Sequence, residues 1–355
     1  MSKLKVAGLQ GLSASSDAIT LANDGTCTAN ITNKPNYNII INGQFDIWQR
    51  ATTSGSVTAS GYNSADRWYI NQSGATSTTS RQTFTAGQTD VPSNPRYYLR
   101  MNATTANNNA GIEQRVEDVD TVQGEHTLSF WVKGTAPAGG NFDVRIFQNF
   151  GSGGSTATEA NLGTFSVSGS WVKKTFTFTP TSLSGKNVGT NSYFQISIRQ
   201  PDSDSTTTAW TLDIANVKLE AGSKATDYQK INIGQELLLC QRYFQKSFDV
   251  NVTPAASVTK CIYQFIRPYT SGFFEAIGND YVVEMRSQPS VTFYPIQGSG
   301  SAGQVSYYDG SSGGWANTTG YYHTSHSTPK RLIFSINTTS STTLVQYNYT
   351  ASAEL

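Results

Sequence analysis

Alternation of apolar and polar side chains decides the fold, and it is clearest in the stretch Trp210-Thr-Leu-Asp-Ile-Ala-Asn-Val-Lys-Leu219. Successive side chains of a β-strand point to opposite faces, so such a run fits a strand with one buried face. The same pattern recurs in residues 127–133, 142–147, 171–178 and 193–198. Short strands with Gly- and Ser-rich connections, and almost no helical periodicity, predict an all-β sandwich.

The composition supports this prediction and narrows the function. Aromatic residues make up 12% of the 355 residues, which suits pleated, half-buried surfaces. Only 14% are charged, with 25 Lys plus Arg against 24 Asp plus Glu, a formal net charge of +1. Nucleic acids and anionic lipids are bound by clustered positive charge, so we expect neither as a partner.

The sequence has no continuous apolar stretch of signal-peptide or membrane-spanning length. We therefore expect synthesis in the cytosol, no export by a signal peptide and no membrane insertion. The three cysteines, Cys27, Cys240 and Cys261, are widely spaced and odd in number. This predicts buried or idle thiols rather than a disulfide framework or a metal knuckle.

The pattern divides the chain into three regions. Residues 1–36 lack long apolar alternation, which predicts an extended arm that a larger assembly holds in place. The alternating runs of the sandwich fall in residues 37–230. Residues 231–355 then predict a short helix and a second, smaller C-terminal β domain.

In the C-terminal region, one helical pattern covers residues 233–246, with Leu237, Cys240, Tyr243 and Phe244 at helical spacing. Strands are expected at residues 261–266, 290–294, 331–336 and 343–349. Residues 297–328, rich in Gly, Ser and aromatic residues, are expected to form a long exposed loop or hairpin.

Three passages resemble bacteriophage and prophage tail-fibre proteins that carry a carbohydrate-binding-module-like jelly roll. The first is Asn38-Ile-Ile-Ile-Asn-Gly-Gln-Phe-Asp-Ile-Trp-Gln-Arg50 with Ala65-Asp-Arg-Trp68. The second, Leu212-Asp-Ile-Ala-Asn-Val-Lys-Leu-Glu-Ala-Gly-Ser-Lys-Ala-Thr-Asp-Tyr228, precedes the predicted helix. The third comprises Met285-Arg-Ser-Gln-Pro-Ser-Val-Thr-Phe293 and Tyr347-Asn-Tyr-Thr-Ala-Ser-Ala-Glu-Leu355. Gln44 and Ala51 depart from the acid and the glycine of the family pattern.

The resemblance implies a non-catalytic structural appendage of a virion. Residues 1–36 would attach to other tail or capsid proteins, and the chain would act as a homotrimer that recognises a host-surface glycan. A helix that is apolar on one face and lies between two β domains suits a three-fold contact. The alternatives are a capsid head fibre, a glycan-depolymerising tail spike and a bacterial carbohydrate-binding protein.

The resemblance also implies a structural calcium site that ties the first and last strands of the jelly roll together. By that matching, the oxygen donors would be Asn42, Gly43, Asp46 and Asp213. Calcium takes roughly 6 to 8 oxygen ligands, and Gln44 leaves the site one carboxylate poorer. The alternative is a hydrogen-bonded strand junction without a metal.

Exposed aromatic side chains are the candidates for sugar binding, because a pyranose ring stacks on them while polar groups bind its hydroxyls. Trp131, Trp171 and Trp210 occur inside alternating runs and are expected in the core, and Trp48 and Trp68 are expected to be structural. The better candidates lie on the expected loop, where recognition is favoured. They are Tyr307, Tyr308, Trp315, Tyr321, Tyr322 and His323. Local packing within a trimeric tip is the alternative.

Catalysis is not expected. The histidines His126, His323 and His326 lack metal-ligand company, and no nucleophile elbow, P-loop or HExxH motif occurs. The paired carboxylates of a glycan-cleaving tail spike would be sought among Glu113, Glu117, Asp118, Asp120, Asp202 and Asp204.

Overall fold

The structure is a computed structural model that describes residues 6–23, 27–29, 36–105, 109–202, 208–265, 277–336 and 342–355. Within these residues the chain is nearly all β, with one α-helix and one short 3-10 helix, η1 (Val119–Thr121). This confirms the predicted fold class. No helix in the described ranges is long and apolar enough to cross a bilayer.

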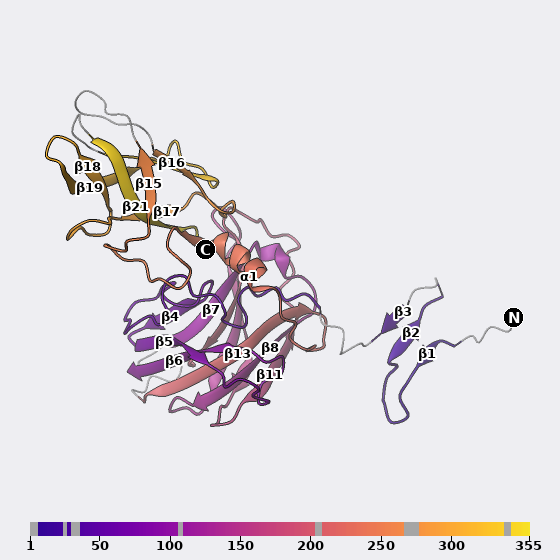
Figure 1. The fold of residues 1–355 in the computed structure, drawn as a ribbon. Helices are drawn as coiled ribbons and strands as arrows, with labels where there is room; N and C mark the ends of the chain where they lie inside the picture. Colours follow the sequence, from indigo (N-terminus) through magenta and orange to yellow (C-terminus); the bar gives the residue numbers. More distant parts are fainter. Residues whose placement is uncertain are drawn as a thin grey trace.

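Ten strands form a jelly-roll sandwich of two five-stranded antiparallel sheets (Figure 1). They are β4 (Tyr69–Ser73), β5 (Thr76–Thr83), β6 (Tyr97–Thr105), β7 (Asn109–Glu117), β8 (His126–Thr135), β9 (Phe142–Asn149), β10 (Thr158–Phe165), β11 (Val172–Phe178), β12 (Tyr193–Arg199) and β13 (Trp210–Ala221). One sheet has the order β10-β9-β12-β7-β4 and is called the groove sheet here. The other has the order β11-β8-β13-β6-β5 and is called the back sheet.

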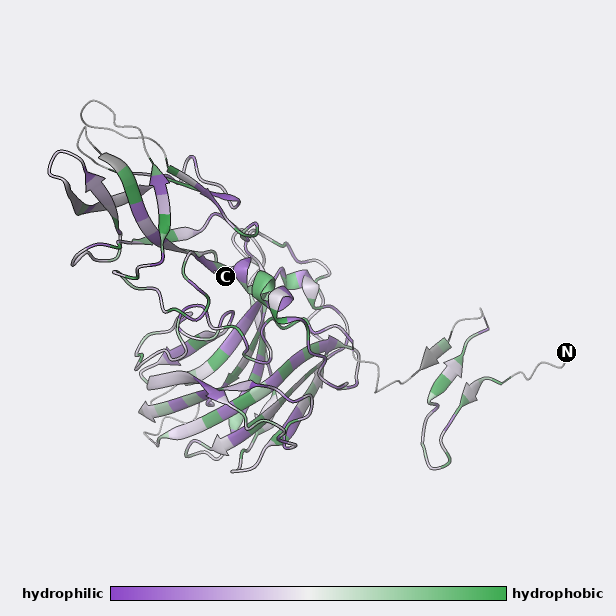
Figure 2. Cartoon of the chain, viewed as in Figure 1, coloured by the Kyte–Doolittle hydropathy of each residue, from purple (hydrophilic) through white to green (hydrophobic). Residues whose placement is uncertain are grey.

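The sandwich core is built from alternate positions of these strands. Phe130 on β8, Ile196 on β12 and Leu212 on β13 are fully buried in one cluster with side chains from both sheets. Figure 2 shows the resulting alternation of hydrophobic and hydrophilic residues along the strands. Because one face of each strand fills the core, the other face of each sheet is left for polar and aromatic side chains.

The strands of the C-terminal β region surround its longest strand, β21. They are β14 (Phe244–Lys246), β15 (Ile262–Phe265), β16 (Ile277–Asp280), β17 (Ser290–Tyr294), β18 (Gln304–Asp309), β19 (Gly314–Tyr322), β20 (Arg331–Ile336) and β21 (Thr342–Ser352). One half of β21 pairs with β14 and β17, and the other half pairs with β15 and β18. Phe293, Phe334 and Tyr347 lie in a hydrophobic core separate from that of the sandwich.

The predicted helix over residues 233–246 is too long. Helix α1 (Ile233–Gln241) begins after Asn232, whose side chain accepts a hydrogen bond from the Gly234 amide. Phe244 then pairs with Ser352 of β21 as the first residue of β14. Strand pairing with β21 therefore overrides the helical spacing of Tyr243 and Phe244.

The N-terminal arm contains a small three-stranded sheet, β1 (Gly8–Leu9), β2 (Ile19–Leu21) and β3 (Cys27–Ala29), set apart from the rest in Figure 1. Between residues 6 and 27, no side chain whose exposure is described is buried. Residues 1–5, 24–26 and 30–35 of the predicted arm lie outside the described ranges. The predicted boundaries after residues 36 and 230 stay predictions.

The C-terminal β region docks on the sandwich through a buried charge cluster, called the joint here. It consists of Arg50, Asp66, Arg67 and Glu354. The Glu354 carboxylate is 3.0 Å from Arg50 Nη2 and also pairs with Arg67. Arg50 is 3.1 Å from Asp66 as well. The joint therefore links the last residues of the chain to the start of the sandwich.

Aromatic rings from the segment after α1 cover both arginines of the joint. The Arg67 guanidinium lies 3.4 Å from the centroid of the Tyr243 ring, and that of Arg50 lies 3.8 Å from that of Phe244. The side chain of Arg67 is 1% exposed and that of Glu354 is 6% exposed. Arg67 also has a φ of 71°, which a non-glycine residue adopts only when its surroundings hold it there.

We expect Glu354→Gln to lower the free energy of unfolding by about 3 kcal/mol, because a neutral amide leaves buried guanidinium charge uncompensated. Chemical denaturation of the full chain measures this change. Glu284→Gln is the matched control, because Glu284 pairs with Lys330 at 3.4 Å with side chains 56% and 72% exposed. Such a surface pair contributes at most about 1 kcal/mol. Equal unfolding midpoints for the two variants would show that the joint does not stabilise the fold.

Candidate functional site

A groove of about 300 Å³ lies on the outer face of the groove sheet. Its walls come from all five strands of that sheet. The lining residues are Tyr69, Asn71, Glu113, Arg115, Arg145, Ile146, Phe147, Glu159, Tyr193, Gln195, Ser197 and Arg199.

Strand alternation places these side chains in the groove. On β12, Phe194, Ile196 and Ile198 are buried in the core, so the residues between them point outward. The antiparallel register then sets Gln195 opposite Arg115 on β7 and opposite Phe147 on β9. Outward residues from distant parts of the sequence thus form rows across the sheet.

The groove has a continuous floor of flat side chains. The Arg115 guanidinium lies between two tyrosine rings, 4.7 Å from the centroid of Tyr69 and 5.0 Å from that of Tyr193. The Phe147 ring follows, with its centroid 6.3 Å from that of Tyr193. Asn149 donates a 3.3 Å hydrogen bond to the Tyr193 hydroxyl and holds that ring in place. Cation–π contacts of this kind fix both the cation and the rings.

Glu113 provides a buried acceptor beside this floor. Its carboxylate accepts hydrogen bonds from Asn71 Nδ2 at 2.6 Å and Ser197 Oγ at 3.1 Å. Burial raises the pKa of the Glu113 carboxyl above its ordinary value. A group of this kind, set in a groove with neutral partners, is suited to reading hydroxyl groups.

Two arginines and three acids balance each other along the other side of the groove. Arg145 lies 2.9 Å from Asp143, 2.9 Å from Glu159 and 3.0 Å from Asp202. Arg199 lies 2.7 Å from Asp202. Gly111 opposite Arg199 leaves room for this network, because a Cβ at Gly111 would stand 2.3 Å from Arg199 Cβ. Both positive charges are already compensated before any ligand arrives.

The aromatic residues proposed from the sequence lie elsewhere, on the hairpin of β18 and β19 or, for His323, directly after it. A hairpin is one of the two forms expected for residues 297–328. Tyr308 pairs with Trp315 in the ladder, and their ring centroids are 5.6 Å apart. Regular pairing with β21 favours the hairpin over a loop, because Tyr307 and Tyr308 are strand residues opposite Val345 and Leu344.

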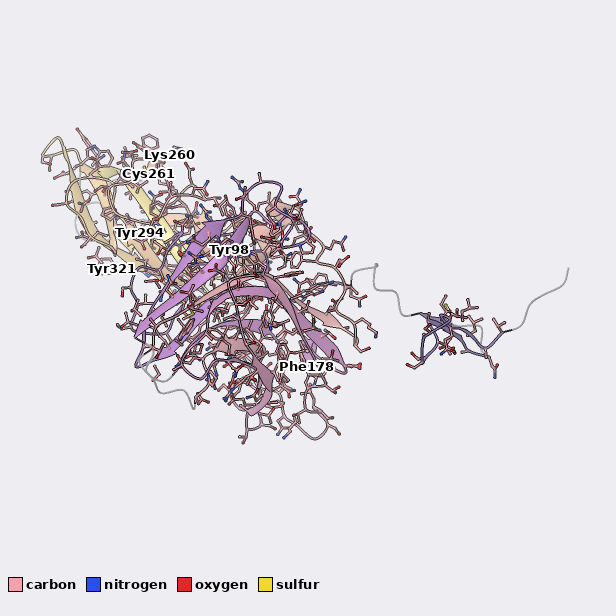
Figure 3. All side chains as sticks on the ribbon, turned by 90° about the horizontal axis from the view of Figure 1, so that it is seen from below. Tyr98, Phe178, Lys260, Cys261, Tyr294 and Tyr321 are labelled. Carbon is pink, nitrogen blue, oxygen red and sulfur yellow. The ribbon has the colours of Figure 1, made fainter. Side chains whose placement is uncertain are left out.

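The hairpin divides the six residues between two faces. Tyr307 and Tyr322 pack against the core of the C-terminal β region, whereas Tyr321 is 49% exposed and is labelled in Figure 3. The His323 ring is 2.8 Å from Ser335 Oγ. The structure therefore does not gather Tyr307, Tyr308, Trp315, Tyr321, Tyr322 and His323 into one surface. Their role in carbohydrate binding stays a prediction.

The residues proposed for calcium use their oxygen atoms on protein partners. Both Asp213 carboxylate oxygens accept hydrogen bonds from Arg100, at 2.6 and 2.7 Å. The Asn42 side chain bonds to the main chain of Ile47 and Asp66. The Gly43 carbonyl accepts the Val217 amide at 2.9 Å.

Asp46 is the fourth predicted donor, and burial raises the pKa of its carboxyl. Calcium prefers several ionised oxygen donors around one centre, whereas Asp213 is neutralised by Arg100 on the outer face of the back sheet. No three His, Cys, Asp or Glu side chains in the described part of the chain form a metal-binding group. The calcium site stays a prediction, with a hydrogen-bonded strand junction without a metal as its alternative.

The tryptophans expected in the core divide as well. Trp210, Trp48 and Trp68 are buried, as predicted. Trp131 and Trp171 instead lie on the outer face of the back sheet, in a small cluster with Tyr98, which is labelled in Figure 3. Leu128, Phe130 and Val132 point into the core, so strand alternation directs the side chain of Trp131 to the opposite face. The sequence already contained this indication.

The groove itself was not predicted. In the sequence, Glu113 stood out only as a candidate acid, and Tyr69, Arg115 and Tyr193 were not singled out. The sequence signal that could have indicated the groove is the set of residues that alternate with the core positions of a strand. In the run 193–198 these are Tyr193, Gln195 and Ser197. Which of these sets come together depends on strand order, which the alternation does not specify.

Residues 37–204 match the model of a family described as a carbohydrate binding domain. The matched range contains all five strands of the groove sheet. No curated protein sequence matches the chain.

Three solved structures illustrate the structural likeness. The first comes from work on the promiscuous specificity of carbohydrate-binding modules of the β-sandwich superfamily. It is 12% identical in sequence, the match covers 57% of this chain and 72% of that chain, and the TM-score is 0.33. The xylan-binding CBM22-1 domain of Xyn10C from Paenibacillus barcinonensis is 14% identical in sequence. The match covers 54% of this chain and 99% of that domain, with a TM-score of 0.30. The enzymatically active domain of tailspike protein 4 of bacteriophage CBA120 is 11% identical in sequence. The match covers 52% of this chain and 21% of that chain, with a TM-score of 0.28. At such TM-scores none of these likenesses bears on the function of this chain.

Proposed function

We propose that the groove binds a glycan chain. The observation that carries this proposal is the floor of Tyr69, Arg115 and Tyr193 beside the buried acceptor Glu113. A sugar ring has an apolar face that stacks on such a floor, and hydroxyl groups that need placed polar partners. The match of residues 37–204 to the carbohydrate binding domain family supports the same assignment.

On the Arg145 and Arg199 side of the groove, the charges favour a glycan that is read through its hydroxyl groups. Arg145 and Arg199 are paired with Asp143, Glu159 and Asp202, so neither offers a free positive charge to an acidic sugar. An added carboxylate would have to displace an existing partner. Hydroxyl groups can instead share the hydrogen bonds of these side chains and of Gln195 without that cost.

We further propose that the chain does not cleave its ligand. Glycoside hydrolysis needs two carboxyl groups on opposite sides of the scissile bond. Glu113 is one such group, but the second acid that lines the groove, Glu159, is bound by Arg145 at 2.9 Å. Asp202 is bound by Arg199 at 2.7 Å and Glu117 by Arg242 at 2.7 Å. Asp118 and Asp120 belong to the η1 segment and do not line the groove. Asp204 lies outside the described residues.

We expect Tyr193→Ala to weaken polysaccharide binding at least about tenfold, because Tyr193 is central to the floor and contacts both Arg115 and Phe147. Affinity gel electrophoresis against β-glucan, xylan, galactan and mannan measures retention of the full chain. Reducing-end release from the same polysaccharides tests for cleavage.

Tyr97→Ala is the matched control for this experiment. Tyr97 is also half-buried and stacked by arginine, with Arg81 at 4.6 Å and Arg96 at 5.0 Å, but it belongs to the back sheet. Retention should therefore be unchanged in this variant. Absence of retention of the unmodified chain by all four polysaccharides would refute the proposed function, as would an equal loss in both variants.

We propose that the protein serves as a virion appendage, in the manner of a phage tail fibre, with a capsid head fibre as the alternative. The sequence resemblance supports this placement. The arm supports attachment through residues 1–36, because its strands of two or three residues bury none of the described side chains. A sheet so small gains stability only when a partner covers it.

A homotrimer is part of the same proposal. Large apolar side chains of α1 support it, since Ile233 is 57% exposed and Leu238 is 46% exposed. Exposed apolar side chains of this kind gain free energy when neighbouring copies bury them. Several copies of a weak groove would then bind one cell surface with high avidity.

We expect the full chain to sediment as a trimer and Leu238→Asp to sediment as a monomer, because a carboxylate cannot be buried cheaply in an apolar contact. Val282→Asp is the control, since Val282 is 69% exposed and is not part of the helix. Sedimentation velocity at micromolar concentration reads out both masses. A monomeric unmodified chain would contradict the trimer.

A further inference from the structure

We propose that Leu355 is a positioning residue of the groove: its main-chain carbonyl holds the Arg115 guanidinium between the two tyrosine rings. This inference rests on the proposed glycan-binding function and adds to it. It makes the last residues of the C-terminal β region part of the binding site of the sandwich, although none of them lines the groove.

Arg115 is held at its head by two hydrogen bonds. Nη1 donates to the Leu355 carbonyl at 2.5 Å, and Nε donates to Gln195 Oε1 at 3.2 Å. These two bonds come from opposite sides of the guanidinium, one from the C-terminal β region and one from the groove sheet. They fix the plane of the group that stacks with Tyr69 and Tyr193.

Leu355 is in turn held by groups that do not line the groove. The Tyr62 hydroxyl donates to the same Leu355 carbonyl at 3.2 Å, and the Tyr62 ring packs edge-on against Tyr69 with centroids 5.1 Å apart. Arg286 donates to the Ala353 carbonyl at 2.8 Å and to the Glu354 carbonyl at 3.2 Å. Residues 353–355 are therefore held by Tyr62 and Arg286 independently of Arg115.

The joint reaches Arg115 by a second path. Arg67, which pairs with Glu354, donates from Nη2 to the Arg115 carbonyl at 2.5 Å. The main chain and the side chain of Arg115 are thus both bonded to groups of the joint or next to it. Docking of the C-terminal β region and the shape of the groove floor depend on the same contacts.

Loss of the Leu355 carbonyl would free a long side chain. Arg115 would keep its contacts with the two tyrosine rings but only one of its two side-chain hydrogen bonds, the longer one to Gln195. Ordering a less restrained side chain on ligand binding costs conformational entropy. By linkage, whatever fixes Arg115 before binding increases the affinity, and bound glycan strengthens docking of the C-terminal β region in return.

The experiment is a double-mutant cycle with the polysaccharide that the full chain retains most strongly among β-glucan, xylan, galactan and mannan. Dissociation constants are measured for the unmodified chain, for the chain lacking Leu355, for Arg115→Ala and for the combination. We expect removal of Leu355 to weaken binding about fivefold, the value of one hydrogen bond that orients a charged group. In the Arg115→Ala background the same removal should change nothing further.

The thermal midpoint of each variant separates positioning from stability. Arg242→Gln is the matched control, because it removes another contact between the two regions, Arg242 to Glu117 at 2.7 Å, without touching Arg115. Its dissociation constant should equal that of the unmodified chain even if its thermal midpoint falls.

Each other outcome counts against a defined claim. If the unmodified chain binds none of the four polysaccharides, the proposed function fails and this inference fails with it. If the unmodified chain binds but removal of Leu355 leaves the dissociation constant unchanged, only the positioning role is wrong. An equal loss with and without Arg115 would show that Leu355 acts by another route.

Discussion

The arrangement of the two β regions depends on one carboxylate. Glu354 partners both Arg50 and Arg67, and the Arg67 side chain is almost fully removed from solvent. A buried guanidinium without a counter-charge costs several kcal/mol, so the C-terminal β region has one favourable position on the sandwich. Rings of Tyr243 and Phe244 cover the two cations and exclude water from the pair. The strained backbone of Arg67 is held by the same contacts.

The joint also brings together several of the passages that carry the family resemblance, though not residues 212–228 or 285–293. Residues 38–50, 65–68, 234–244 and 347–355 are far apart in the chain, yet their side chains meet in this one place. Gln49, for example, donates both to Asp66 and to the carbonyl of Phe244. These motifs therefore report how the two regions are joined. They do not report the ligand, because none of the residues of the joint lines the groove.

The groove has a different physical origin. It is formed by outward residues of a sheet whose other face is filled by the core, and its chemistry is set by which strands are neighbours. Tyr69, Arg115 and Tyr193 lie on β4, β7 and β12, three strands that are adjacent in the sheet but separated by long stretches of sequence. The contact between Arg115 and Leu355 is where the groove and the joint meet.

The sequence by itself determined the all-β class, five of the ten sandwich strands (β8, β9, β11, β12 and β13) and the strands at residues 290–294 and 331–336. Alternation is a local property that a strand must satisfy whatever its neighbours are. The end of helix α1, the choice of a hairpin over a loop at residues 304–322 and the use of Asp213 by Arg100 were decided by partners distant in the chain, mainly β21 and β6. The groove was likewise decided by contacts between residues distant in the chain. Its residues are ordinary polar and aromatic positions until strand order brings them side by side, and strand order is set by the packing of the whole sandwich.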